Sequence, residues 1–89
     1  MSNKFNKHDW EVAAKSLLKS EMLHFEVDYA QLAERMEKMG IPNISSDNLR
    51  SKINRGSFSA TFLIQALIAI GCDEINIKNL PIKKRLKLS

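Results

Sequence analysis

The segment SSDNLRSKINRGSFSATFLIQALIAIG, residues 45–71, contains two helix signals in succession. Each signal begins with a serine that can cap a helix and ends with a glycine: Ser45 with Gly56, and Ser59 with Gly71. Glycine is frequent just after a helix because it adopts the left-handed conformation there without steric strain. The segment therefore predicts two helices, over residues 46–55 and 60–70.

A capping residue followed by a closing glycine occurs once more, upstream of this segment. Asp28 can cap a helix in which Gln31 completes a capping box, and Gly40 marks the end. Apolar residues flank all three caps at the spacing of a hydrophobic staple, in the pairs Val27 with Leu32, Ile44 with Leu49, and Phe58 with Leu63. Another helix is therefore expected over residues 29–39.

Before Asp28, an apolar stripe with helical spacing predicts a first helix over residues 9–25. The stripe consists of Trp10, Ala13, Ala14, Leu17, Leu18, Met22 and Phe25. Glu21 lies within the stripe, and we expect it to pair with Arg35 because a buried carboxylate needs a partner. The helix over residues 29–39 is expected to turn these side chains inward: Tyr29, Leu32, Ala33, Met36 and Met39.

Length and composition limit the architecture. A chain of 89 residues, 44% of them hydrophobic, can form one small core. We expect an all-α, compact domain of four to five helices over residues 1–72, followed by a basic tail over residues 73–89. The single cysteine excludes an internal disulfide, no apolar run is long enough for a membrane span, and the N-terminus lacks the apolar stretch of a signal peptide. A soluble, cytoplasmic protein without a membrane partner is therefore expected.

Charge is unevenly distributed along the chain, whose formal net charge is +4. Residues 1–45 contain six Lys or Arg and seven Asp or Glu, whereas residues 46–89 contain eight and three. An excess of positive charge in one half favours an anionic partner, nucleic acid before membrane.

The helix over residues 46–55 is expected to present a polar, cationic surface, because only Leu49 and Ile53 form its core stripe. At about 100° per residue, the outer face comprises Asp47, Asn48, Ser51, Asn54 and Arg55, with Arg50 and Lys52 on its shoulders. Short polar side chains that can bond to base edges thus lie between cations that can reach phosphates, which is typical of a major-groove helix. An ordinary solvated face is the alternative. The lack of acids between Asp47 and Asp73 favours nucleic acid.

The helix over residues 60–70 is apolar on nearly every side. A small monomer cannot easily cover such a surface, so we expect the C-terminal segment, a second subunit or another partner to do so. Alternating apolar residues predict that the tail is extended, as a dimerising strand, a basic arm or a frayed end. The residues expected at a dimer or partner contact are Phe62, Ile64, Ile68, Ile75 and Ile77.

The segments VDYAQLAERMEKMG, NLRSKINRG and SATFLIQALIAIGC resemble the second, third and fourth helices of the Cro/repressor-type (lambda-repressor-like) helix-turn-helix domain. The resemblance covers residues 18–72. The chain also resembles a small bacterial family of such domains without an assigned function. It departs from the family pattern at ERMEKMG, which adds about one helical turn, and at IPNI, which lengthens the following connection.

The resemblance implies that the helix over residues 46–55 enters the major groove, while the starts of the neighbouring helices contact phosphates. Carried over to this chain, it places Ser46, Asp47, Asn48, Arg50 and Ser51 near bases. It places Tyr29, Lys52, Arg55 and Ser57 near the phosphate backbone.

The function expected from these patterns is sequence-specific binding of double-stranded DNA, by a homodimer that acts as a small transcriptional regulator of bacterial or phage type. The alternative is a protein-interaction module, antitoxin-like or anti-activator, that docks a partner through the helix over residues 60–70. RNA binding is a third reading. No enzyme activity, metal or cofactor is expected, because His8, His24 and Cys72 lack the spacing of ligands or of a catalytic pair.

Overall fold

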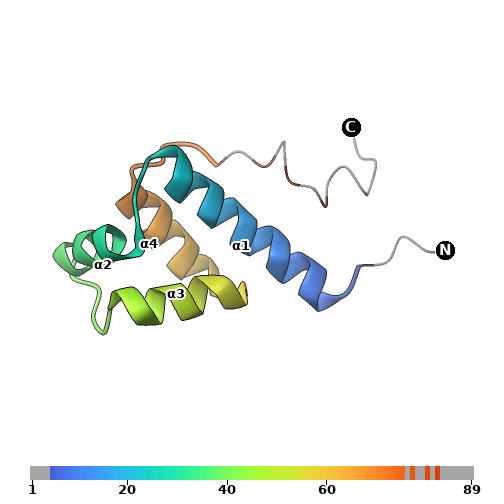
Figure 1. Ribbon diagram of the computed structural model, residues 1–89, viewed down its shortest axis with the longest axis horizontal. Coiled ribbons are helices and arrows are strands. Elements are labelled where there is room, and N and C mark those ends of the chain that lie inside the picture. The colour runs from blue at the N-terminus through green and yellow to red at the C-terminus, as the bar shows by residue number, and fades with distance from the viewer. Residues whose placement is uncertain (1–4, 76, 78–79, 81, 83–89) are drawn as a thin grey trace.

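The computed structural model describes residues 5–75, 77, 80 and 82. Within these residues the chain forms an all-α, compact four-helix globule (Figure 1). The helices are α1 (Lys7–His24), α2 (Tyr29–Lys38), α3 (Ser46–Arg55) and α4 (Ala60–Ile70). The bounds expected for α3 and α4 are confirmed, whereas α1 begins two residues earlier than expected and α1 and α2 each end one residue earlier.

Side-chain caps explain where the helices start. Asp28 and Ser45 each accept a hydrogen bond from the backbone three residues ahead and form reciprocal capping boxes, and Ser59 accepts from Phe62 N. The early start of α1 has the same origin, because Asn6 and Asp9 form a further capping box. Each cap satisfies backbone N–H groups that have no partner within their own helix.

The core lies where α1 and α2 each pack against both α3 and α4. Its fully buried side chains come from all four helices: Leu18, Leu32, Met36, Leu49, Ile53 and Ile70. Both members of the pair Val27 and Leu32 belong to this core. In the apolar pairs that flank the caps Ser45 and Ser59, Leu49 is in the core, and Ile44, Phe58 and Leu63 pack against it.

Three residues expected in the core are exposed, namely Trp10, Phe25 and Met39. Trp10 lies in the first turn of α1, where its ring contacts the ring of Phe5 edge to face and does not join the core. Phe25 and Met39 are the C-cap residues of α1 and α2, where the chain turns away from the helix axis. Helical periodicity does not reveal where neighbouring elements end.

The expected ion pair between Glu21 and Arg35 does not form. Arg35 Nη1 donates hydrogen bonds to the carbonyl oxygens of Ala69 and Ile70, at 3.1 and 3.3 Å. A cation at the C-terminus of a helix is attracted to the negative end of the helix dipole and satisfies carbonyls that lack a partner within the helix. Arg35 therefore fastens α2 to the end of α4.

In the tail expected from residue 73 onward, the structure describes residues 73–75, 77, 80 and 82, of which Ile82 is buried and Ile75 and Ile77 are exposed. The basic arm expected at Lys83, Lys84, Arg85 and Lys87 lies outside the described residues. Over the described part, none of the helices combines the length and apolarity that crossing a membrane requires.

Candidate nucleic-acid interface

The polar surface expected on α3 is present. Leu49 and Ile53 are the buried residues of α3, and Ser46 is half-buried. The remaining side chains are exposed and form what we call the α3 face: Asp47, Asn48, Arg50, Ser51, Lys52, Asn54 and Arg55. This face therefore carries three cations and one acid, without any large apolar side chain.

The acid on the α3 face is paired with one of the cations. Arg50 Nη1 donates to Asp47 Oδ1 at 3.1 Å, in an ion pair between two exposed side chains. The Arg50 guanidinium also lies over the ring of Tyr29, the first residue of α2, with 5.2 Å between the guanidinium carbon and the ring centre. Tyr29 is half-buried and packs against the core. Its ring lies beside the basic helix α3.

The other two cations lie further along α3. Lys52 Nζ lies 5.0 Å from the ring centre of Phe62, and Arg55 has no ion-pair partner among the described residues. Both line a groove of about 440 Å³ between α3, the connection that precedes it and the start of α4. Ser51, Ser59 and Thr61 supply hydroxyl groups to the same groove. An anion placed there meets two positive charges and hydrogen-bond donors.

Two amides of the α3 face are already engaged within the protein. Asn48 Oδ1 accepts from Ser45 N at 3.1 Å, and Asn48 Nδ2 donates to the carbonyl of Asn43 at 2.7 Å. Asn54 Oδ1 accepts from Lys19 Nζ of α1 at 3.1 Å. An amide that reads a base must first release such partners, so these residues are less available to a ligand than their exposure suggests.

Lys19 is a further cation beside this face that the sequence did not indicate. It belongs to the C-terminal half of α1, 35 residues from Asn54, and reaches α3 because α1 and α3 pack together. No local sequence pattern indicates that Lys19 lies close to Asn54. Of the residues expected near phosphates, Ser57 is exposed, in the short connection between α3 and α4.

Of the five apolar residues expected at a partner contact, Ile75 and Ile77 are exposed in the segment after α4, and the other three belong to α4. Phe62 is 5% exposed and belongs to the core, so its side chain is unavailable to a partner. Ile64 and Ile68 are 54% and 60% exposed and lie one turn apart on α4, which places them on the same face of that helix. They form a small apolar patch distinct from the α3 face.

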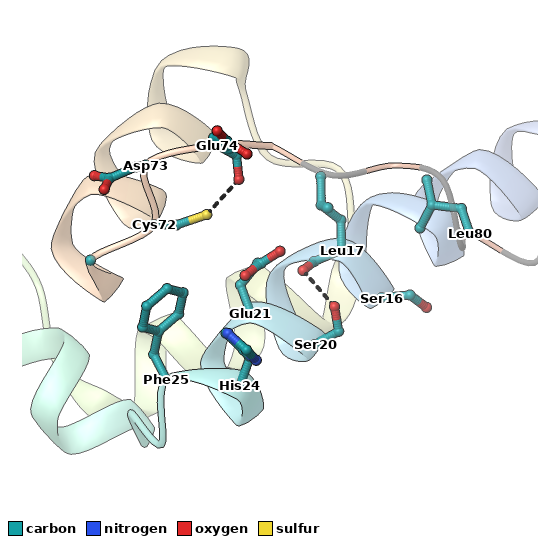
Figure 2. A pocket seen from close by; sticks show the side chains of 11 residues that line it. Ser16, Leu17, Ser20, Glu21, His24, Phe25, Cys72, Asp73, Glu74 and Leu80 are labelled. Carbon is teal, nitrogen blue, oxygen red and sulfur yellow. Dashed lines mark hydrogen bonds between the residues drawn. The ribbon is translucent and has the colours of Figure 1, made fainter.

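A larger pocket lies elsewhere, between α1 and the segment after α4 (Figure 2). Its volume is about 730 Å³, and it is lined by Glu21 and His24 of α1 and by Cys72, Asp73 and Glu74 of the later segment. Burial raises the pKa of the Cys72 thiol and the negative charge of Glu21 adds to the rise, while the hydrogen bond with the Glu74 backbone partly opposes it. The thiol is therefore a poor nucleophile at neutral pH.

The polar groups of this pocket are not arranged as a metal site. The Cys72 thiol donates to the carbonyl of Glu74 at 2.9 Å, and Ser20 Oγ donates to the carbonyl of Leu17 at 3.3 Å. Among the described residues, no group of three or more His, Cys, Asp and Glu side chains is suited to hold a metal ion. The acidic lining also opposes the binding of a polyanion.

No curated protein and no solved structure is significantly similar to the chain. A family model does match residues 10–75, a region that begins within α1 and ends after α4. The matched region contains the α3 face and most of the core, and spans well over half of the chain. The chain therefore belongs to the family described as the domain of unknown function DUF6471.

Proposed function

We propose that this domain binds double-stranded DNA through α3, with sequence specificity, and acts as a small transcriptional regulator of bacterial or phage type. The observation that carries the proposal is the α3 face, on which Arg50, Lys52 and Arg55 surround short polar side chains. Its acid, Asp47, already pairs with Arg50. Cations at the sides of an otherwise small and polar helix suit phosphates flanking a groove.

The arrangement of the helices supports a lambda-repressor-like helix-turn-helix. α2 packs against α3, and α3 presents its polar side to solvent while its apolar side joins the core. Residues 39–45 connect the two helices, and this connection is longer than the turn of about 3–4 residues in a typical helix-turn-helix. In that connection the protein departs from the lambda-repressor-like pattern. The proposal requires only that α3 itself enters the major groove of DNA.

The distribution of charge supports DNA as the partner over a neutral protein surface. Lys19 of α1 extends the positive region beyond α3, and the groove beside Lys52 and Arg55 leads to the start of α4. The first backbone N–H groups of a helix also attract anions, which favours a phosphate near Ser59. Phosphates on both sides of a major groove would then meet cations from several elements.

Binding of random duplex DNA, measured by fluorescence anisotropy over a series of salt concentrations, tests this proposal. We expect steeply salt-dependent binding, and a decrease of about two in the log–log salt slope for a Lys52→Ala, Arg55→Ala double variant. A Lys7→Ala, Lys38→Ala double variant is the control, because it removes equal charge from lysines that pair with Glu11 and Glu34. Failure of the wild type to bind at low salt, or equal losses in both double variants, contradicts the proposal.

A second candidate function is a protein-interaction module, antitoxin-like or anti-activator, and the exposed pair Ile64 and Ile68 favours it. For the DNA-binding function, we propose instead that a second copy of the chain covers this patch. Such a dimer would pair two α3 helices with two half-sites on DNA. A different protein partner on the same patch would instead indicate the interaction module. Charge removal on α3 would leave the binding of such a partner unchanged.

A further inference from the structure

Arg50 differs from the other two cations of the α3 face because it is held on two sides. Its guanidinium donates to Asp47 within α3, at 3.1 Å, and lies over the ring of Tyr29 from α2. Tyr29 is itself anchored, since it packs against the core and its hydroxyl oxygen is buried. Residues of two helices therefore restrict where this guanidinium lies.

This arrangement leaves most of the donors of Arg50 available. A guanidinium has five N–H donors, and among the described residues Asp47 accepts from one of its nitrogens. The side chain is 55% exposed, so the remaining donors can reach a ligand. A planar group with fixed orientation and free donors is suited to a ligand that presents two acceptors side by side.

Asp47 indicates which ligand that is. Its side chain is 93% exposed and adjacent to the guanidinium, so a phosphate that approaches Arg50 also approaches a carboxylate. A base edge carries no net charge and is repelled far less, and guanine presents the acceptors O6 and N7 to the major groove. The two acceptors of guanine lie side by side on the base edge, so a guanidinium can donate to both at once.

We propose that Arg50 reads a guanine in the major groove, and that Tyr29 and Asp47 are positioning residues that orient it. The inference rests on the proposed DNA binding and assigns the sequence preference to one side chain. Lys52 and Arg55 then bind phosphates and contribute affinity without sequence preference. A single bidentate contact of this kind corresponds to a preference for guanine of about 5- to 150-fold at one position.

Selection of bound duplexes from a randomised DNA library tests the assignment. Affinities are then measured for the selected site and for the same site with the guanine replaced. We expect the wild type to select guanine at one position. Arg50→Ala and Arg50→Lys lose that preference, because lysine cannot make the planar bidentate contact. Arg55→Ala is the matched control, since it removes an equal charge and is expected to bind all duplexes more weakly while still selecting guanine.

The positioning residues give an independent readout. Asp47→Ala is expected to bind random DNA more tightly and to select guanine less sharply, because it removes both a repulsive charge and one support of Arg50. A merely structural or solvated Asp47 would not change affinity and preference in opposite directions. Tyr29→Leu weakens the preference more than Tyr29→Phe, which keeps the ring.

The outcomes separate this inference from the function on which it rests. If the wild type binds no duplex, the proposed function fails and this assignment fails with it. If it binds without a base preference, or with a preference that Arg50→Ala and Arg50→Lys retain, DNA binding stands and the assignment of Arg50 is overturned. Circular dichroism spectra that match the wild type establish that each variant is folded.

Discussion

The last turn of α3 meets the backbone of α1 at Gly56, where a Cβ atom would lie 2.7 Å from the carbonyl carbon of Glu11. Gly56 is buried and has a φ of 71°, in the left-handed region that residues with a side chain rarely adopt. Conformation and close approach thus both require glycine at this position. The contact fixes how α3, and with it the α3 face, lies against α1.

Gly56→Ala is therefore expected to lower the free energy of unfolding by about 2–4 kcal/mol, from backbone strain and overpacking together. Gly40→Ala and Gly71→Ala are matched controls, because both glycines have positive φ but no atom lies within 4 Å of an added Cβ. These controls are expected to lose about 1 kcal/mol each. Urea denaturation measures all three, and equal losses would show that the contact with Glu11 is unimportant.

Arg35→Met is expected to lower the free energy of unfolding by about 1–2 kcal/mol. The change removes the donor to the carbonyls of Ala69 and Ile70 and a positive charge at the end of α4. Lys38→Met on the same helix is the control, because Lys38 forms only an exposed ion pair with Glu34. Similar denaturation midpoints for the two variants would contradict the role assigned to Arg35.

Cys72 is expected to react slowly with iodoacetamide at neutral pH, because burial and the charge of Glu21 raise the pKa of its thiol. Glu21→Gln should accelerate the reaction at a fixed pH. Since the unfolded chain releases the thiol proton at lower pH, the folded state should also lose stability as the pH rises above about 8.5. Alkylation rates across a pH series provide the measurement, and a rate equal to that of a free thiol would refute the expectation.

The wild type is expected to be a dimer at micromolar concentration, and an Ile64→Lys, Ile68→Lys double variant a monomer of similar stability. The substituted side chains are 54% and 60% exposed, so charge there should disrupt an interface without disturbing the core. Leu23→Lys is the control, because Leu23 is exposed on α1 and is not part of the patch on α4. Sedimentation equilibrium measures the mass, and a monomeric wild type would eliminate the dimer.

Helix positions were predictable where several local signals agreed. The bounds of α3 and α4 follow from a capping serine, flanking apolar residues and a closing glycine, all within one short segment. The start of α1 was missed because its cap, Asn6 with Asp9, precedes the apolar stripe that begins at Trp10. A cap is recognised from sequence chiefly when a periodic run follows it immediately.

Contacts between helices were harder to anticipate. The expected pair of Glu21 with Arg35 assumed that a carboxylate in an apolar stripe is fully buried, yet Glu21 borders an open pocket and Arg35 reaches the end of α4. Which residue lies opposite another depends on how helices cross, and periodicity alone contains no such information.

The composition of the α3 face was predictable, but the state of its side chains was not. Periodicity identified the exposed residues correctly, whereas the hydrogen bonds of Asn48 to Asn43 and of Asn54 to Lys19 depend on the loop and on α1. The orientation of Arg50 by Tyr29 likewise requires α2 to lie beside α3. Exposure therefore follows from a helical pattern, while availability to a ligand follows from tertiary contacts.

The N-caps also influence how quickly the chain can fold. Each of the four helices carries a side chain that closes its own first turn, at Asn6, Asp28, Ser45 and Ser59. Nucleation of that turn is the unfavourable step of helix formation, and helical domains with mostly local contacts fold in microseconds to milliseconds. Ribosomes add only about 5–20 residues per second. During synthesis, each capped turn therefore has ample time to form and dissolve many times before the next helix is made.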